Sequence, residues 1–224
     1  MSARRAIRSL TIAPAVALML AAALSGTATA RRLRFSEEHI RAVWAGANFE
    51  APFSTIRCPM TLEGRLLGRT FDKVPGGLIG EIIRARIREE SCTPAETRIV
   101  AFNGFENYNG GFTPNSLPWS LTYEAFRGTL PNIGGIRVEA ERIRIGVTNA
   151  GCTAQYGKAE DHITFELFRR NEGIISAVVP VTGENILNRF RVDAGTLCPT
   201  SAAMSGTGDF MVDGGLARVT VTLI

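Results

Sequence analysis

Apolar and polar side chains alternate with a period of two along much of this 224-residue chain, and this alternation constrains its fold more than any other feature. Residues 81–90, 161–168 and 218–223 all follow the rule. In the first of these runs, it places Ile83 and Ala85 on the same, buried side. A period of two predicts strands with one buried and one solvated face, as in antiparallel sheets.

Short clusters of glycine, asparagine, aspartate and proline separate the alternating runs. They are Pro75-Gly76-Gly77, Asn109-Gly110-Gly111, Gly134-Gly135, Asn149-Ala150-Gly151, Thr182-Gly183 and Asp213-Gly214-Gly215. Closely spaced turn signals between short strands predict an all-β domain with an antiparallel β-sandwich or barrel-like fold. The last cluster also predicts a hairpin that joins residues 210–212 to residues 216–219.

Two segments admit more than one interpretation. Residues 36–49 carry apolar side chains both at helical spacing after Ser36 and at strand spacing. We favour a strand, because the chain that follows is predicted to be β throughout. In residues 136–147 the apolar positions slip by one near Glu141 and Arg142, which predicts a β-bulge.

The first thirty residues have the pattern of a secretory signal peptide. Three arginines precede an apolar run over residues 11–24, and Ala28-Thr29-Ala30 supplies the small residues of a cleavage site. We therefore predict a signal peptide over residues 1–30 and one secreted β domain over residues 31–224, located outside the cell or in the cell envelope. Export by the Sec route or the twin-arginine route stays open. The run is shorter than the roughly 20 apolar residues of a membrane span, so no transmembrane segment is predicted in the mature chain.

The net charge of +4 does not indicate a nucleic-acid-binding protein. Residues 1–30 contain three arginines and no acidic residue, so their removal leaves a nearly neutral chain. Binding to nucleic acid needs a surplus of positive charge on one face, whereas arginine and glutamate are interspersed here. No nucleic-acid partner is predicted.

Four cysteines, an even number, predict two disulfides in an exported chain. They are Cys58, Cys92, Cys152 and Cys198, and their wide spacing lacks the close pairs of a zinc site. Four cysteines allow three pairings. The shared Cys-Pro flanks of Cys58 and Cys198 favour bridges Cys58–Cys198 and Cys92–Cys152.

No motif indicates nucleophilic catalysis. Ser205 precedes Gly206-Thr207-Gly208, but the sequence around it is not the G-x-S-x-G of a nucleophile elbow. A serine triad with Asp161 or His162 could still be assembled in space. Because nothing in the sequence activates the serine, we predict no catalytic residue and no cofactor.

Acidic clusters give no sharp metal signal either. Glu160-Asp161-His162 offers three ligands, but neighbours on a strand point to opposite faces. Asp209 and Asp213 lack the ligand spacing of a calcium loop. No metal site is predicted.

Glu139 and Glu141 are the one pair of carboxylates spaced for glycoside hydrolysis. On a strand they share a face with about 7 Å between Cα atoms, and glycosidase carboxyl groups lie roughly 5–10 Å apart. Arg137, Arg142 and Arg144 flank the pair. We favour a surface ladder of ion pairs between these arginines and the two carboxylates.

Residues 103–116 form the segment most suited to bind a ligand. Phe105, Tyr108 and Phe112 lie there among asparagines and glycines, and Trp119 follows. Long glycine-rich loops often carry function, and such aromatics could stack on a sugar. For Trp119 a place in the core is the competing interpretation.

The chain resembles a family of exported bacterial all-β proteins that have no assigned activity. The residues that carry the resemblance are Cys58-Pro59-Met60-Thr61-Leu62-Glu63-Gly64, Leu117-Pro118-Trp119, Gly128-Thr129-Leu130-Pro131-Asn132-Ile133, Leu197-Cys198-Pro199 and Ser205-Gly206-Thr207-Gly208. The resemblance implies a secreted β domain and assigns no catalytic residue.

These observations favour a secreted, non-catalytic binding or structural protein of the cell surface or envelope, with an envelope component or polysaccharide as its partner. Two alternatives stay open. One is a secreted glycan hydrolase that uses Glu139 and Glu141. The other is a carrier that holds a small hydrophobic ligand inside a sandwich or barrel.

Overall fold

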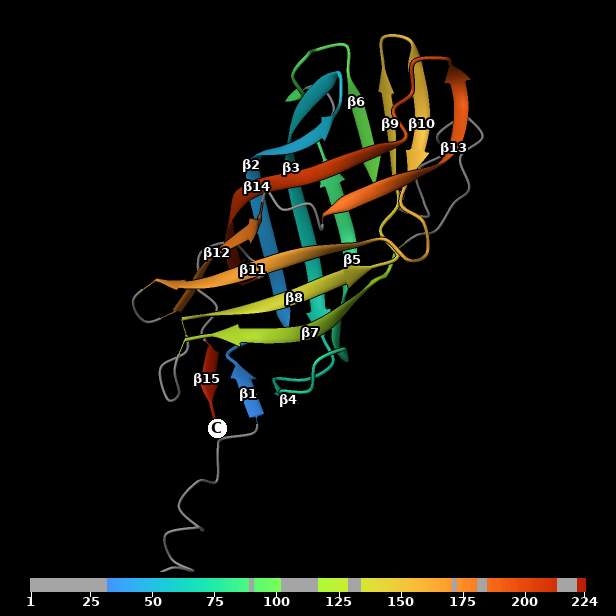
Figure 1. Cartoon of the computed structure of the whole chain (residues 1–224). Coiled ribbons are helices and arrows are strands. Elements are labelled where there is room, and N and C mark those ends of the chain that lie inside the picture. The colour runs from blue at the N-terminus through green and yellow to red at the C-terminus, as the bar shows by residue number, and fades with distance from the viewer. Residues whose placement is uncertain are drawn as a thin grey trace, which may run out of the picture. The chain divides into compact units, whose positions relative to one another are not determined.

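Residues 32–88, 91–101, 117–128, 134–170, 173–180, 185–212 and 221–224 are described by the computed structural model shown in Figure 1. Arg32–Ile224 form one unit, and only this unit is discussed below. The predicted all-β class is confirmed, because strands account for nearly all of its regular structure. No helix in the described part is long and apolar enough to cross a membrane.

The strands have the following bounds. They are β1 Arg32–Phe35, β2 His39–Ala51, β3 Ser54–Leu66, β4 Thr70–Asp72, β5 Gly77–Ile87, β6 Arg98–Ala101, β7 Trp119–Arg127, β8 Gly135–Glu141, β9 Ile145–Asn149, β10 Cys152–Tyr156, β11 His162–Arg170, β12 Gly173–Val179, β13 Ile186–Gly195, β14 Ser201–Val212 and β15 Val221–Leu223.

Eight of these strands close into an antiparallel barrel. In chain order they are β2, β3, β5, β7, β8, β11, β12 and β14, and each pairs with the next around the barrel. The pairing of β14 with β2 completes the circle, with Asp209 opposite Val43. The barrel is therefore an up-and-down meander, in which neighbours in the chain are also neighbours in space. Its closure decides between the two predicted alternatives, a sandwich and a barrel-like fold.

Four further strands, β13, β10, β9 and β6, continue the sheet beyond β14, and we call them the extension. The start of β14 pairs with β13, where Ala203 lies opposite Ile186. Farther along, β14 pairs with β12, where Gly208 lies opposite Ala177. β14 therefore belongs to both the barrel and the extension. Along the same edge of β14, β13 is the partner of its first residues and β12 is the partner of later ones (Figure 1).

A separate three-stranded sheet of β15, β1 and β4, here called the cover, lies at one end of the barrel (Figure 1). Leu33 and Phe35 of β1 are fully or almost fully buried. The ring of Phe35 lies 5.4 Å from that of Phe71 on β4, which in turn lies 5.9 Å from that of Tyr123 in the barrel. Aromatic packing thus attaches the cover to the barrel wall.

The strand predicted over residues 36–49 is confirmed as β2, whereas the bulge predicted at Glu141 and Arg142 is wrong. Arg142 adopts a left-handed backbone with φ of 62° between two strands, β8 and β9. The first strand belongs to the barrel and the second to the extension. The phase slip therefore marks the point at which the chain leaves the barrel.

Two other local predictions concern Ile83 and the C-terminal hairpin. Ile83 is exposed rather than buried, because an irregularity in the pairing of β3 with β5 leaves this residue without a partner opposite it. Ile82 and Ala85 take the inward positions. The turn of the predicted C-terminal hairpin lies outside the described residues, and β15 pairs with β1.

The two predicted disulfides are confirmed, but the favoured pairing is wrong. The bridges are Cys58–Cys92 and Cys152–Cys198. Arg57 and Thr93 exchange backbone hydrogen bonds, which brings Cys92 beside Cys58. Similar flanking residues carry no information on spatial proximity, and this pairing is set by strand neighbours instead.

Candidate binding cavity

An apolar cavity of about 40 Å³ lies inside the barrel. Its fifteen lining residues include at least one from each of the eight barrel strands, and none of them is charged. Phe35 of β1 also lines the cavity, which places the cavity at the end of the barrel that the cover closes. The space is thus bounded by the barrel wall and by the cover.

The cavity exists because small residues lie among large ones on the inner wall. Ala42, Gly64 and Ala177 line it beside Trp44 and Phe165. Protein interiors are normally packed without voids of this kind, and a water molecule needs only about 10–15 Å³ of such space. A wall without hydrogen-bond partners binds water poorly. The cavity is therefore suited to an apolar guest.

Trp44 explains the glycines of the Ser205-Gly206-Thr207-Gly208 motif. A Cβ atom at position 208 would lie 2.8 Å from Cδ2 of the Trp44 indole and 2.6 Å from the backbone oxygen of Val43. The indole is 1% exposed and forms part of the cavity wall. The glycines therefore make room for a large aromatic side chain, while the Ser205 hydroxyl donates a hydrogen bond to Glu50 (3.1 Å).

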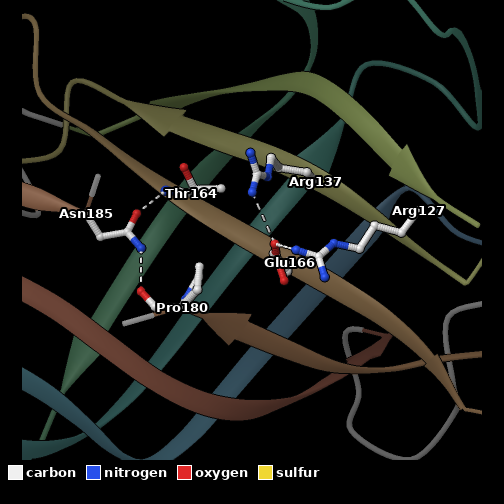
Figure 2. A network of polar contacts seen from close by, with 6 residues as sticks. All are labelled: Arg127, Arg137, Thr164, Glu166, Pro180 and Asn185. Atoms are coloured by element: carbon white, nitrogen blue, oxygen red, sulfur yellow. Dashed lines mark hydrogen bonds and ion pairs between the residues drawn. The ribbon is translucent and has the colours of Figure 1, made fainter. Parts of the chain in front are cut away.

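The seam of the barrel is completed by a side chain. β12 ends at Val179, and beyond this point Asn185 connects the neighbouring strands (Figure 2). Its Oδ1 accepts a hydrogen bond from the backbone N–H of Thr164 (2.7 Å), and its Nδ2 donates to the Pro180 oxygen (2.8 Å). The Met204 N–H donates to the Asn185 backbone oxygen (2.9 Å). The fully buried Asn185 thus links β11 to β14.

A buried carboxylate lies on the outer face of the same wall. Glu166 of β11 is 5% exposed and contacts the guanidinium groups of Arg127 and Arg137 (Figure 2). The Arg137 contact measures 3.3 Å. Residues Glu166 and Arg137 lie opposite each other in the register of β11 and β8. The buried negative charge is therefore paired across strands.

Glu139 and Glu141 share the outer face of β8, as predicted, because Val138 and Ala140 point inward. The contacts of these side chains cross to other strands. Arg137 forms an ion pair with Glu166, and the Nε2 of His162 lies 3.9 Å from the Glu139 carboxylate. A ladder between the two carboxylates and the flanking arginines stays a prediction.

Cross-strand neighbours, rather than neighbours in sequence, set these partners. Burial raises the pKa of the Glu139 carboxyl; His162 and Arg137 lower the pKa, whereas Glu124 and Glu141 raise it further. Arg144 lies over the ring of Phe190, 4.9 Å from its centroid.

The predicted aromatic site is only partly described. Phe105, Tyr108 and Phe112 lie outside the described residues, so their role stays a prediction. Trp119 begins β7 and is 3% exposed, which supports the competing interpretation that it belongs to the core.

The other candidate ligands are placed as follows. Among the described residues, no group of three or more His, Cys, Asp or Glu side chains is arranged to hold a metal ion. Asp161 accepts hydrogen bonds from the backbone N–H groups of Lys158 and Asn188, so it links the segment before β11 to β13. Asp209 is exposed on β14, and Asp213 lies outside the described residues.

Sequence reasoning missed the residues that shape the cavity. Ala42 and Ala177 occupy inward positions of strands, which alternation alone can identify. That they line the same cavity depends on strand pairings that the local sequence does not show.

Comparison of the chain with protein-family models, with curated proteins and with solved structures finds no match. The resemblance to the exported bacterial family therefore stays a prediction, and the function is argued from the geometry alone.

Proposed function

We propose that the protein is an exported, non-catalytic binding protein that holds a small apolar molecule inside its barrel. The observation that carries this proposal is the apolar cavity, which is lined by all eight barrel strands. Eight-stranded barrels have an interior that is either filled by side chains or holds one small ligand. The glycine and alanines on this inner wall favour the second alternative.

The size of the space limits the guest. About 40 Å³ accommodates a group of few heavy atoms, such as the end of an alkyl chain. Each 100 Å² of apolar ligand surface that leaves water contributes about 2.5 kcal/mol. Binding therefore depends on apolar contact rather than on charge, and the carrier alternative becomes the working hypothesis.

The test is binding of xenon, an apolar probe of a single atom, by the purified protein, measured by xenon NMR, together with mass spectrometry of its organic extract. Ala177→Leu places three additional carbon atoms at the cavity wall and should abolish the binding of the probe. Ala125→Leu makes the same change at an exposed position of β7 and should have no effect. Equal binding by both variants, or no binding by the wild type, would contradict the proposal.

Location in the cell envelope is part of the same proposal. The predicted signal peptide supports it, and the two disulfides are compatible with an oxidising compartment. Incubation with isolated envelope and its polysaccharides should deplete the protein from solution without releasing reducing ends. Protein that stays in solution would argue against an envelope partner.

A glycan hydrolase is the second candidate, because of Glu139. Burial raises the pKa of this carboxyl, as a general acid requires, and Glu141 follows on the same face. Release of reducing ends from envelope polysaccharide, lost in the Glu139→Gln and Glu141→Gln double variant, would support this candidate. Full activity of that variant would exclude both carboxyls from catalysis.

A further inference from the structure

Exposed apolar side chains are concentrated in residues 186–197. Among the described residues, ten large hydrophobic side chains are exposed, and four of them lie in this short stretch: Ile186, Phe190, Val192 and Leu197. The first three belong to β13, the strand of the extension that follows β14 in the sheet. Exposed apolar side chains that gather on one element mark an interaction surface.

The same strand has an open hydrogen-bonding edge. β13 lies between β14 and β10 in the sheet, and each neighbour covers a different part of it. Residues 186–188 pair with β14, whereas residues 189–195 pair with β10. On the side of β14, no strand in the described part of the chain therefore pairs with residues 190–195. Figure 1 shows this part of β13 at the outer edge of the extension, with β10 on its other side.

The connection from β13 to β14 turns away from this edge. Cys198 is bridged to Cys152, which begins β10, and the Leu197 N–H donates to the oxygen of Gly151, in the turn just before β10 (3.4 Å). The chain therefore leaves the end of β13 in the direction of β10. An open strand edge is a template on which another strand can pair.

β13 has only one of the features with which proteins protect such edges. Its sequence contains neither proline nor lysine. The charge of Arg191 is balanced by Asp193, with 2.6 Å between Nε and Oδ1. The remaining feature is a pair of register shifts against β10, on either side of Arg191 and Val192. Shifts of this kind increase the twist of a strand, so a further strand can follow β13 only over the short stretch around Val192.

This stretch is complementary to itself in an antiparallel arrangement. When two copies of β13 meet with Val192 opposite Val192, Arg191 of each copy lies opposite Asp193 of the other, and Phe190 lies opposite Ala194. Opposite charges that face each other across strands are stabilising. Moving the centre of the pairing by one residue would place Arg191 or Asp193 opposite itself, and like charges in this position are destabilising. One register is therefore preferred.

Two other arginines near this stretch are engaged within the chain. Arg189 donates a hydrogen bond to the Cys198 oxygen. Arg144 lies over the ring of Phe190, 4.9 Å from its centroid. The preference for one register therefore comes from Arg191 and Asp193.

We infer that two copies of this chain associate through the open edge of β13, as a symmetric dimer with Val192 on the two-fold axis. Two-fold dimers are the commonest homo-oligomers, and they require a surface that is complementary to itself. The paired stretch is short, so the dimer is weak, with an expected dissociation constant of about 1–100 µM. The inference is independent of the cavity function.

Sedimentation velocity of the purified protein, at concentrations from about 1 µM to 1 mM, should show this dimer. Arg191→Glu and Asp193→Lys should each weaken it at least about tenfold, because each variant alone places like charges opposite each other. An equimolar mixture of the two variants should dimerise again, since the two new side chains then face each other with opposite charge. Circular dichroism checks that both variants are folded.

A single cysteine tests the two-fold axis without altering the charges. Residues opposite each other in antiparallel strands have Cα atoms about 4.5–5.5 Å apart, within the range of a disulfide. Val192→Cys should therefore give a covalent dimer under mild oxidation. Ile186→Cys is the matched control, because this residue is about equally exposed on the same strand. In the proposed dimer the two copies of position 186 lie about 40 Å apart, so this variant should not form the crosslink.

A wild type that stays monomeric at about 1 mM would overturn the inference, and it would point to an extended segment of another protein as the partner of this edge. An unchanged dissociation constant in Arg191→Glu would overturn it too, as would crosslinking of Ile186→Cys at the rate of Val192→Cys. Support would come from a dimer that either charge variant weakens, that their mixture restores and that Val192→Cys captures.

Discussion

At the scale of single residues, the contact between Gly208 and Trp44 predicts a steep cost for one added methyl group. Gly208→Ala places a Cβ 2.8 Å from the indole and 2.6 Å from a backbone oxygen, so strand or ring must shift. Overpacking of this kind lowers the free energy of unfolding by about 1–3 kcal/mol. Urea unfolding monitored by tryptophan fluorescence measures the change.

Gly68→Ala is the matched control, because no atom lies within 4 Å of a Cβ at that position. Its free energy of unfolding should stay within about 0.5 kcal/mol of the wild type. Equal losses in both variants would show that the change from glycine to alanine itself, rather than the indole contact, determines the cost at position 208.

Glu139 predicts a dependence of stability on pH. Because its pKa is raised in the folded protein, the native state holds this proton more tightly than the unfolded chain does. Between the ordinary pKa of 4.5 and the raised one, the Glu139 contribution to stability therefore decreases as the pH rises. Glu139→Gln removes this contribution, so the variant should gain stability relative to the wild type over that window.

Urea unfolding of both proteins at a series of pH values, with an NMR titration of the Glu139 carboxyl carbon, tests the prediction. His162→Asn serves as the control, because it removes a neighbour that lowers the pKa of Glu139 and keeps the Glu139 carboxyl itself. The control should keep the decrease. A carboxyl carbon that titrates below the ordinary value would contradict the structure.

At the scale of elements, the strands were predictable and their partners were not. Alternation in β11 identified Ile163 and Phe165 as inward residues, and both are buried. At Arg142, where the chain passes from β8 to β9, the sequence pattern was that of a bulge. A bulge and a single residue with left-handed backbone both shift the alternation of apolar positions by one. Local side-chain patterns report which face is buried, but they do not report which strand lies alongside.

The disulfides carry the prediction that belongs to this scale. Cleavage of the unreduced protein by trypsin should yield one linked peptide pair with Cys58 and Cys92 and another with Cys152 and Cys198. Loss of either bridge by Cys→Ser substitution should cost about 2–5 kcal/mol. Mass spectrometry of the linked peptides checks the pairing, and a peptide that joins Cys58 to Cys198 would contradict it.

At the scale of the whole molecule, the closure of the barrel predicts that the amide side chain of Asn185 contributes strongly to the stability of the folded protein. Asn185→Ala removes the bond to the Thr164 N–H and leaves this buried donor unpaired at the seam. An unsatisfied buried group costs roughly 1–3 kcal/mol. Hydrogen exchange at the Thr164 amide should accelerate together with the loss of stability.

Asn149→Ala is a suitable control, because Asn149 Oδ1 is buried without a hydrogen-bond partner. Its removal should cost little or nothing. Equal effects of the two substitutions would show that the seam does not depend on Asn185.

The cavity also belongs to this scale, and it explains the limit of sequence reasoning here. An inward alanine on β2 and another on β12 become neighbours of one space only when the sheet closes. Whether the inward side chains of eight strands fill the interior depends on how their sizes match in the closed barrel. The sequence of each strand alone is equally compatible with a filled core. Asn185 likewise gives no sign of a seam in the sequence, because its bonds to Thr164 of β11 and Met204 of β14 form only in the closed barrel.

The meander order of the barrel has a consequence for how the chain acquires its fold. Some successive barrel strands, such as β2 and β3, meet through contacts that are close in sequence, and such local contacts form fast. The pairing of β14 with β2 is different, since Asp209 and Val43 are far apart in the chain and must meet across a large loop. The barrel therefore has open edges until β14 reaches β2, and a slow ring closure would prolong the time for which such an edge is exposed to aggregation.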